Sequence, residues 1–146
     1  MEEDFVIVLV ESDLNHALLI IKNFRKIGFE NEILHFRNNK EVVDFLFRRG
    51  NGLRRAKDTA YLLILGISNS EEKEVIKEIK QDICLRIMPI IVITNTDSQK
   101  ETEECYELGC NIYLTKPVDY KEFVDLVNKL GLFLAIVKAP KINHET

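Results

Sequence analysis

The chain has 146 residues, of which 46% are hydrophobic and 30% are charged, and its formal net charge is -4. That composition is too apolar for a disordered chain, and the length suits one domain with a single core. A mild acidic excess gives no reason to expect nucleic-acid binding, which relies on a surplus of Lys and Arg. No apolar run approaches the ~20 residues that span a bilayer, and the acidic start MEEDF lacks the basic region of a signal peptide. We therefore expect a cytoplasmic protein that has no membrane partner.

Thiols and imidazoles are too scattered along the chain to indicate a disulfide framework or a metal site. The cysteines are odd in number and none has CxxC spacing, so we expect free thiols in a reducing compartment. The histidines suggest neither a phospho-acceptor nor a set of metal ligands. These residues are Cys84, Cys105, Cys110, His16, His35 and His144.

The first half of the chain predicts a strand, a helix, a strand and a helix in that order. The run over 5–10 is apolar without alternation, which indicates a strand covered on both faces. A helical period over 13–28 ends at a glycine, and a second one over 39–49 also ends at a glycine. Between them, 33–36 is short and flanked by charges, as an edge strand would be. The apolar positions that define the first helix are Leu14, Leu18, Ile21 and Phe24.

The second half continues the same alternation to the end of the chain. Ser68 and Ser70 are candidate caps for its first helix, and Gly109 ends its second, which is mostly polar. Strands are predicted over 61–65, 89–93 and 112–115, and helices over 71–82, 98–108 and 119 to about 137. Five strand–helix repeats specify a doubly wound α/β fold with no second domain. We expect this domain to cover 1–138 and a tail to cover 139–146.

Candidate functional residues follow the carboxyl ends of the predicted strands, because ligands of doubly wound sheets bind in the crevice at that edge. A carboxylate, a glycine, a hydroxyl group and an ammonium group converge there. The residues just past the strand ends are Glu11, Ser12, Asp13, Gly66, Ile67, Ser68, Thr94, Asn95, Lys116 and Pro117.

Three of these strand ends carry a family resemblance. The segments VLVESD, IVIT and YLTKPVD, with the spacing between them, resemble the receiver domains of two-component response regulators. The resemblance implies a flavodoxin-like or CheY-like three-layer sandwich with a five-stranded parallel sheet in the order 2-1-3-4-5. The stretches FLFRRGNGLRRAK and GLFLAIVKAP are similar to the small stand-alone receivers associated with bacterial phytochromes.

The resemblance also implies roles for individual residues. Thr94 would contact a phosphoryl group, Lys116 would be its cationic partner, and Tyr113 would be the switch aromatic, although an ordinary aromatic role for Tyr113 stays open. Pro117 would follow a cis peptide, and Glu11 would be the first of two acids that help to hold Mg²⁺.

Two positions depart from the family pattern. Gly66 stands where the phospho-accepting aspartate is expected, and Ser12 stands where the second acid of the pair is expected. Glycine has no carboxylate to form an acyl phosphate, and Glu11 alone should hold Mg²⁺ weakly or not at all. We expect no catalysis, no cofactor and no metal, with Lys116 closing on Glu11 in a locked pair. The remnants of the site are Glu11, Ser12, Asp13, Thr94, Tyr113, Lys116 and Pro117.

Two alternatives remain open for this site. One is a phosphorylatable receiver with an unconventional acceptor, for which Ser68 and Asp13 are the neighbours, although Asp13 reads more simply as a helix cap. The other is a small-ligand or nucleotide site in the vacated pocket, which no glycine-rich phosphate loop supports.

Without phosphorylation, we expect a pseudo-receiver that acts by binding a protein partner, and such binding needs a surface. The last helix carries more apolar residues than one core-facing stripe uses. We expect a homodimer through this surplus, with a sensor histidine kinase or a downstream regulator as a further protein partner. The alternative is that the tail after Gly131 folds back onto its own domain. The predicted dimer interface is Phe123, Val127, Leu130, Phe133, Leu134 and Val137.

A basic loop is the last feature of note. Arg48, Arg49, Arg54, Arg55 and Lys57 cluster around two glycines. A solvated loop is the simplest interpretation, because no interleaved aromatic residues support stacking on nucleic acid.

Overall fold

The computed structural model describes residues 4–142 and contains the predicted parallel sheet in the order β2-β1-β3-β4-β5. Each neighbouring pair along this order runs parallel. The strands are β1 Val6–Val10, β2 Ile33–Phe36, β3 Thr59–Ile67, β4 Ile90–Thr94 and β5 Ile112–Thr115. The helices are α1 Leu14–Lys26, α2 Asn39–Leu46, α3 Glu71–Gln81, α4 Gln99–Leu108 and α5 Tyr120–Leu134, with a short 3-10 turn, η1, at Leu85–Ile87.

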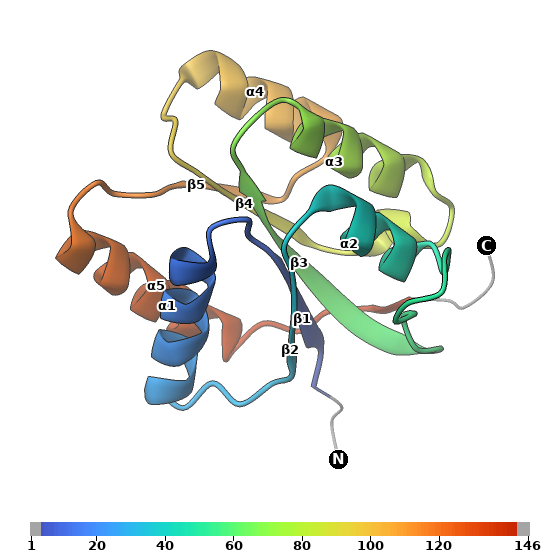
Figure 1. The fold of residues 1–146 in the computed structure, drawn as a ribbon, viewed down its shortest axis with the longest axis horizontal. Coiled ribbons are helices and arrows are strands. Elements are labelled where there is room, and N and C mark those ends of the chain that lie inside the picture. Colours follow the sequence, from blue (N-terminus) through green and yellow to red (C-terminus); the bar gives the residue numbers. More distant parts are fainter. Residues whose placement is uncertain (1–3, 143–146) are drawn as a thin grey trace.

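Helices cover both faces of the sheet, so the fold has three layers (Figure 1). Helices α1 and α5 lie on one face, and α2, α3 and α4 lie on the other. The interior strand β1 divides its side chains between two cores, with Val8 and Val10 in one and Ile7 and Leu9 in the other. Burial on both faces explains why these strands are apolar without alternation.

Helix α1 buries only part of the stripe that the sequence indicates, because Phe24 lies in the core and Ile21 packs against it but Leu14 and Leu18 do not. Leu14 and Leu18 are 45% and 54% exposed, whereas Ala17 and Ile20 are buried together with Phe24. The small Ala17 lets α1 lie close to its neighbours, and the approach to α5 is closer still at Gly131, where a Cβ atom would collide with Ile27. The two leucines are therefore left as exposed apolar surface.

A short antiparallel strand that the sequence does not indicate, β6 at Lys141–Ile142, pairs with the start of β3. Thr59 lies opposite Ile142, whose side chain is fully buried in the core on the α2 and α3 side. This end of the chain therefore folds back onto its own domain, as the alternative interpretation held. The rest of the expected tail, with His144, lies outside the described residues.

Two other expectations concern the whole chain. Cys84, Cys105 and Cys110 are buried, and no disulfide joins them within residues 4–142. Within residues 4–142, no helix combines the length and the apolar character that a membrane crossing requires.

Candidate functional site

The carboxyl edge of the sheet brings the predicted residues together around a small cavity. The strand register sets Gly66 beside Ile93 and Thr94 beside Thr115, so the ends of β3, β4 and β5 lie in line. The cavity has a volume of about 220 Å³. Its lining residues are Glu11, Ser12, Asp13, His16, Gly66, Ile67, Ser68, Asn95 and Lys116.

A buried ion pair closes this cavity on one side. The Nζ atom of Lys116 lies 2.7 Å from Oε1 of Glu11, and the two side chains are only 8% and 6% exposed. The second oxygen of Glu11 accepts a hydrogen bond of 3.0 Å from the backbone N–H of Asp13. The expected pairing of Lys116 with Glu11 is therefore present, and removing either partner would leave an uncompensated charge.

His16 adds a third group to the ion pair, a contact that was not predicted from the sequence. The Lys116 ammonium lies 3.0 Å from Nδ1 of His16. An ammonium group only donates, so this Nδ1 must be the unprotonated acceptor of the ring. The imidazole also packs edge-on against Phe123, with ring centroids 5.3 Å apart. Its place on the first turn of α1, five residues after Glu11, is the signal that could have found it.

Asp13 is the N-terminal cap of α1, as its simpler interpretation predicted. One of its carboxylate oxygens accepts hydrogen bonds from the backbone N–H groups of Asn15 and His16. The bond from His16 makes the larger contribution, and together the two bonds hold the pKa of Asp13 below its usual value. Ser12 next to it is exposed.

Gly66 allows Glu11 to occupy its observed position. A Cβ atom at residue 66 would lie 3.0 Å from Oε1 of Glu11 and 3.0 Å from the carbonyl oxygen of Val10. Such distances are shorter than ordinary van der Waals contact, so a side chain at this place would force Glu11 to shift. The absence of a side chain and the closed pair are thus structurally linked.

Tyr113 and Thr94 are held on the other side of the sheet edge. The Tyr113 hydroxyl group lies 2.8 Å from Oε1 of Glu101 on α4 and 3.0 Å from the carbonyl oxygen of Thr96. Burial of the hydroxyl group is the main cause that raises the pKa of Tyr113, and the hydrogen bond to Glu101 raises it further. Thr94 is buried, and its Oγ1 accepts a 3.3 Å bond from the N–H of Thr96. Tyr113 is therefore tied to α4.

The peptide bond before Pro117 is trans, because none of the peptide bonds in residues 4–142 is cis. The expected cis peptide is therefore wrong for this chain. The two isomers of a bond to proline differ little in energy, so the surrounding backbone decides between them. Here the Lys116 N–H is fixed by a 2.6 Å bond to the carbonyl oxygen of Thr94.

The loop after β3 is organised by Glu72, which the sequence did not single out. This carboxylate is 5% exposed and accepts bonds from the backbone N–H groups of Ser68 and Asn69, at 2.7 and 3.2 Å. It also accepts hydrogen bonds from the Ser68 hydroxyl group at 3.2 Å and from the side-chain amide of Asn39 at 2.9 Å. Neither Ser68 nor Ser70 caps α3 with its side chain; Asn69 Oδ1 accepts the first free N–H instead.

A larger groove lies beside the cavity, between α1 and the start of α5. It has a volume of about 560 Å³, and His16, Lys116 and Asn95 line the groove as well as the cavity. Leu18 and Tyr120 contribute exposed apolar surface to it, together with the fully exposed Val118. Lys116, His16 and Asn95 thus lie between the small cavity and the larger apolar groove.

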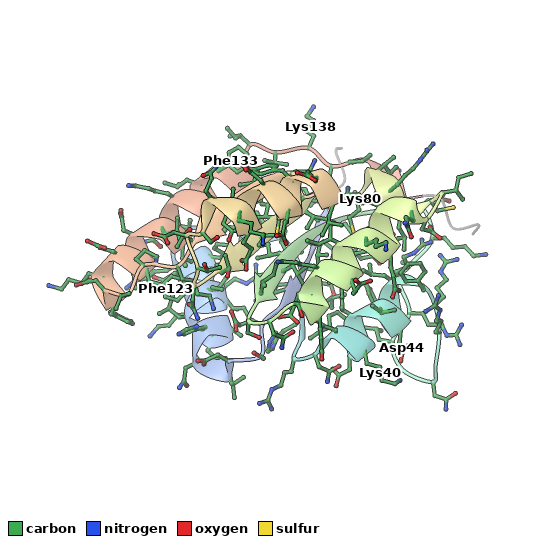
Figure 2. All side chains as sticks on the ribbon, turned by 90° about the horizontal axis from the view of Figure 1, so that it is seen from above. Lys40, Asp44, Lys80, Phe123, Phe133 and Lys138 are labelled. Atoms are coloured by element: carbon green, nitrogen blue, oxygen red, sulfur yellow. The ribbon has the colours of Figure 1, made fainter. Side chains whose placement is uncertain are left out.

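The last helix keeps most of its apolar residues inside. Four of the six residues expected at a dimer interface are less than 7% exposed within this chain and pack in the core between α5 and the sheet; they are Phe123, Val127, Leu130 and Leu134. The surplus is smaller than the sequence indicates because the approach of α1 covers one side of α5. Phe133 (Figure 2) remains 43% exposed, beside the exposed Leu132 and Ile136.

Comparison with known proteins places this geometry in a family, although no family model matches the chain. The probable methanogenesis regulatory protein of Methanothrix harundinacea is 32% identical over 129 residues, which cover 88% of this chain and 83% of that protein.

Solved structures agree. A response-regulator receiver domain from Rhodospirillum rubrum has a TM-score of 0.87 at 35% identity, covering 94% of this chain and 99% of that one. A bacteriophytochrome response regulator has a TM-score of 0.70 at 28% identity, covering 94% of this chain and 84% of that one. The chain therefore belongs to the response-regulator receiver family of two-component signalling, and it is not an enzyme.

Proposed function

We propose that this receiver does not take an aspartyl phosphate and acts through protein–protein interaction that is independent of phosphorylation. The observation that carries the proposal is the buried Glu11–Lys116 pair beside Gly66, with its 2.7 Å contact. An acyl phosphate requires a carboxylate nucleophile, and Gly66 offers none. The lysine that would neutralise a phosphoryl group is already neutralised by Glu11.

The residues at this edge do not fit Mg²⁺ either. A Mg²⁺ site needs oxygen ligands that are free to coordinate, and Glu11 is engaged by Lys116 and by the Asp13 amide. Asp13 caps α1 and Ser12 has no charge. We infer that Mg²⁺ binds weakly or not at all, so that neither nucleophile nor metal is supplied to a phosphodonor.

Incubation with Mg²⁺ and acetyl phosphate, followed by intact-mass measurement, tests the proposal. The expected mass is that of the unmodified chain. A phosphoryl adduct would overturn the proposal and favour the unconventional acceptor, and mapping it to Ser68 or Asp13 would identify that acceptor.

The apolar groove between α1 and α5 is the surface we assign to the protein partner. Leu18, Val118 and Tyr120 are 54% or more exposed there, and burying such surface favours association. We propose a sensor histidine kinase or a downstream regulator as the partner, in the cytoplasm. Leu18→Glu should weaken co-purification of that partner from native extract, whereas Leu132→Glu, on the far end of α5, should not.

A homodimer remains part of the proposal, on a smaller surface than the sequence suggested. The exposed apolar residues at the end of α5 are Leu132, Phe133 and Ile136. Multi-angle light scattering should give twice the monomer mass for the parent and a lower mass for Phe133→Glu. A monomer mass for the parent at micromolar concentration would contradict the dimer.

A further inference from the structure

The basic loop between α2 and β3 contains a buried arginine that the receiver site does not use. Arg55 is 2% exposed. Its backbone N–H donates to the carbonyl oxygen of Phe45 at 3.1 Å, and its Nε donates to that of Leu46 at 2.7 Å. Arg55 therefore closes the C-terminal end of α2, where helix carbonyl groups lack partners within the helix.

The other end of this side chain has no hydrogen-bond or ion-pair partner among residues 4–142. Both Nη1 and Nη2 of Arg55 are buried without a hydrogen bond, and none of the ion pairs within residues 4–142 includes Arg55. Burial first, and then the like charge of Arg48, lowers the pKa of Arg55. A guanidinium group nevertheless stays protonated in proteins, so a positive charge is enclosed here with no carboxylate paired to it within residues 4–142.

The neighbouring groups are committed elsewhere. Asp82 acts on Arg55 only from a distance, and its Oδ2 accepts the N–H groups of Cys84 and Leu85 at 3.0 and 2.9 Å. Arg54 donates to the carbonyl oxygens of Arg48 and Gly50. Among the arginines of the loop, Arg55 thus differs in having two buried donors that point at no acceptor.

We propose that Nη1 and Nη2 of Arg55 bind a small oxyanion, of the phosphate or carboxylate class, enclosed beneath the 48–55 segment. A guanidinium fork presents two parallel N–H donors, the geometry that oxyanions accept in a bidentate manner. Both donor atoms are almost inaccessible to a water-sized probe, so an oxyanion can reach them only when the covering segment moves. Entry requires movement of the exposed 49–54 segment, in which Gly50 and Gly52 are the residues with least side-chain constraint.

Thermal unfolding of the full chain at constant ionic strength, with sodium phosphate, acetate or chloride, tests this site. An anion that binds only the folded chain raises the unfolding midpoint, and at about ten times its Kd it raises the folding equilibrium constant about tenfold. We expect a saturable rise with phosphate or with acetate, and the arm that saturates at the lower concentration identifies the class. Chloride offers the fork one acceptor atom in place of two oxygens, so any rise with chloride should need a much higher concentration than the rise with the oxyanion.

Two variants separate this site from general charge effects. Arg55→Met should abolish the saturable rise, whereas Lys57→Met, which removes an exposed cation of the same loop, should keep it. Arg55→Lys retains the positive charge but not the guanidinium fork, so it should weaken the rise in the unfolding midpoint. This variant replaces Arg55→Met if the latter does not fold. An equal rise in the parent and the Arg55 variants, or no rise in the parent, would overturn the oxyanion site and leave the receiver proposal untouched.

Discussion

Among single residues, Lys116 makes the contacts that close the site. Its ammonium group is shared between Glu11 at 2.7 Å and His16 at 3.0 Å, in surroundings that largely exclude water. The sequence predicts the pairing with Glu11, because both residues follow strand ends that meet at one edge. The contact with His16 is not predictable in the same way, because it depends on how the first turn of α1 is oriented above that edge.

Breaking the pair from one side should be costly. Lys116→Met leaves the buried Glu11 carboxylate uncompensated, and a loss of roughly 3–5 kcal/mol in the free energy of unfolding is expected. The double variant Glu11→Gln with Lys116→Met should recover much of that loss, because neither charge remains. Lys40→Met is the matched control: its pair with Asp44 (Figure 2) has a similar 2.8 Å distance, but Lys40 is 85% exposed, so the free energy should hardly change. Urea unfolding measures all of these, and equal losses for the two lysines would contradict the buried pair.

His16 should act as an acceptor rather than as a packing residue. His16→Phe keeps a ring against Phe123 and removes the nitrogen that accepts from Lys116, whereas His16→Asn retains a side-chain acceptor. In ¹⁵N NMR, we expect the protected ammonium signal of Lys116 to weaken in the Phe variant and to persist in the Asn variant. An unchanged signal in His16→Phe would show that Glu11 alone holds the lysine.

At the scale of elements, the sequence predicts the strands better than the faces of the helices. Burial on both faces makes the strand runs continuous, which is an unambiguous pattern. In α1, apolar residues occupy more of the helix surface than the core can cover, and packing against the sheet and α5 buries the side with Ala17. The two-residue strand β6 is too short to produce a pattern, and its position follows from pairing with Thr59 and Ala60.

Ile142 should anchor that strand. Its side chain is fully buried, so Ile142→Ala should lower the free energy of unfolding by about 2–5 kcal/mol, as large-to-small changes in a core do. Val118→Ala, at a fully exposed apolar position, is the control and should leave stability nearly unchanged. A negligible effect of Ile142→Ala would mean that β6 detaches readily in solution.

At the scale of the whole molecule, the resemblance and the alternation of strands and helices predicted the sheet order, and the fold then decided which candidate residues meet. Glu11, Gly66 and Lys116 converge as expected, because parallel strands end at one edge. The number of exposed apolar residues on the last helix was overestimated, because the sequence alone does not show that α1 and α5 cover each other. Exposed apolar residues remain in the groove beside Lys116 and at the end of α5, and others, such as Leu53 and Ile83, are scattered over the rest of the surface.

The variant Gly66→Asp would restore a carboxylate at the position of the expected acceptor and so test whether the other residues of the site can still bind Mg²⁺. The new carboxylate would crowd Glu11 and compete with it for Lys116, so we expect weak Mg²⁺ binding in the variant and none in the parent. Isothermal titration with Mg²⁺ measures the difference. If the variant gains nothing, Ser12 or the Glu72-organised loop is a further obstacle.

The most direct test of the central claim is the intact mass of the parent chain after exposure to acetyl phosphate and Mg²⁺, measured beside Gly66→Asp. The account predicts that the parent retains the mass of the unmodified chain. A phosphoryl adduct on the parent would contradict it, because the chain would then possess an acceptor that the Glu11–Lys116 lock does not block.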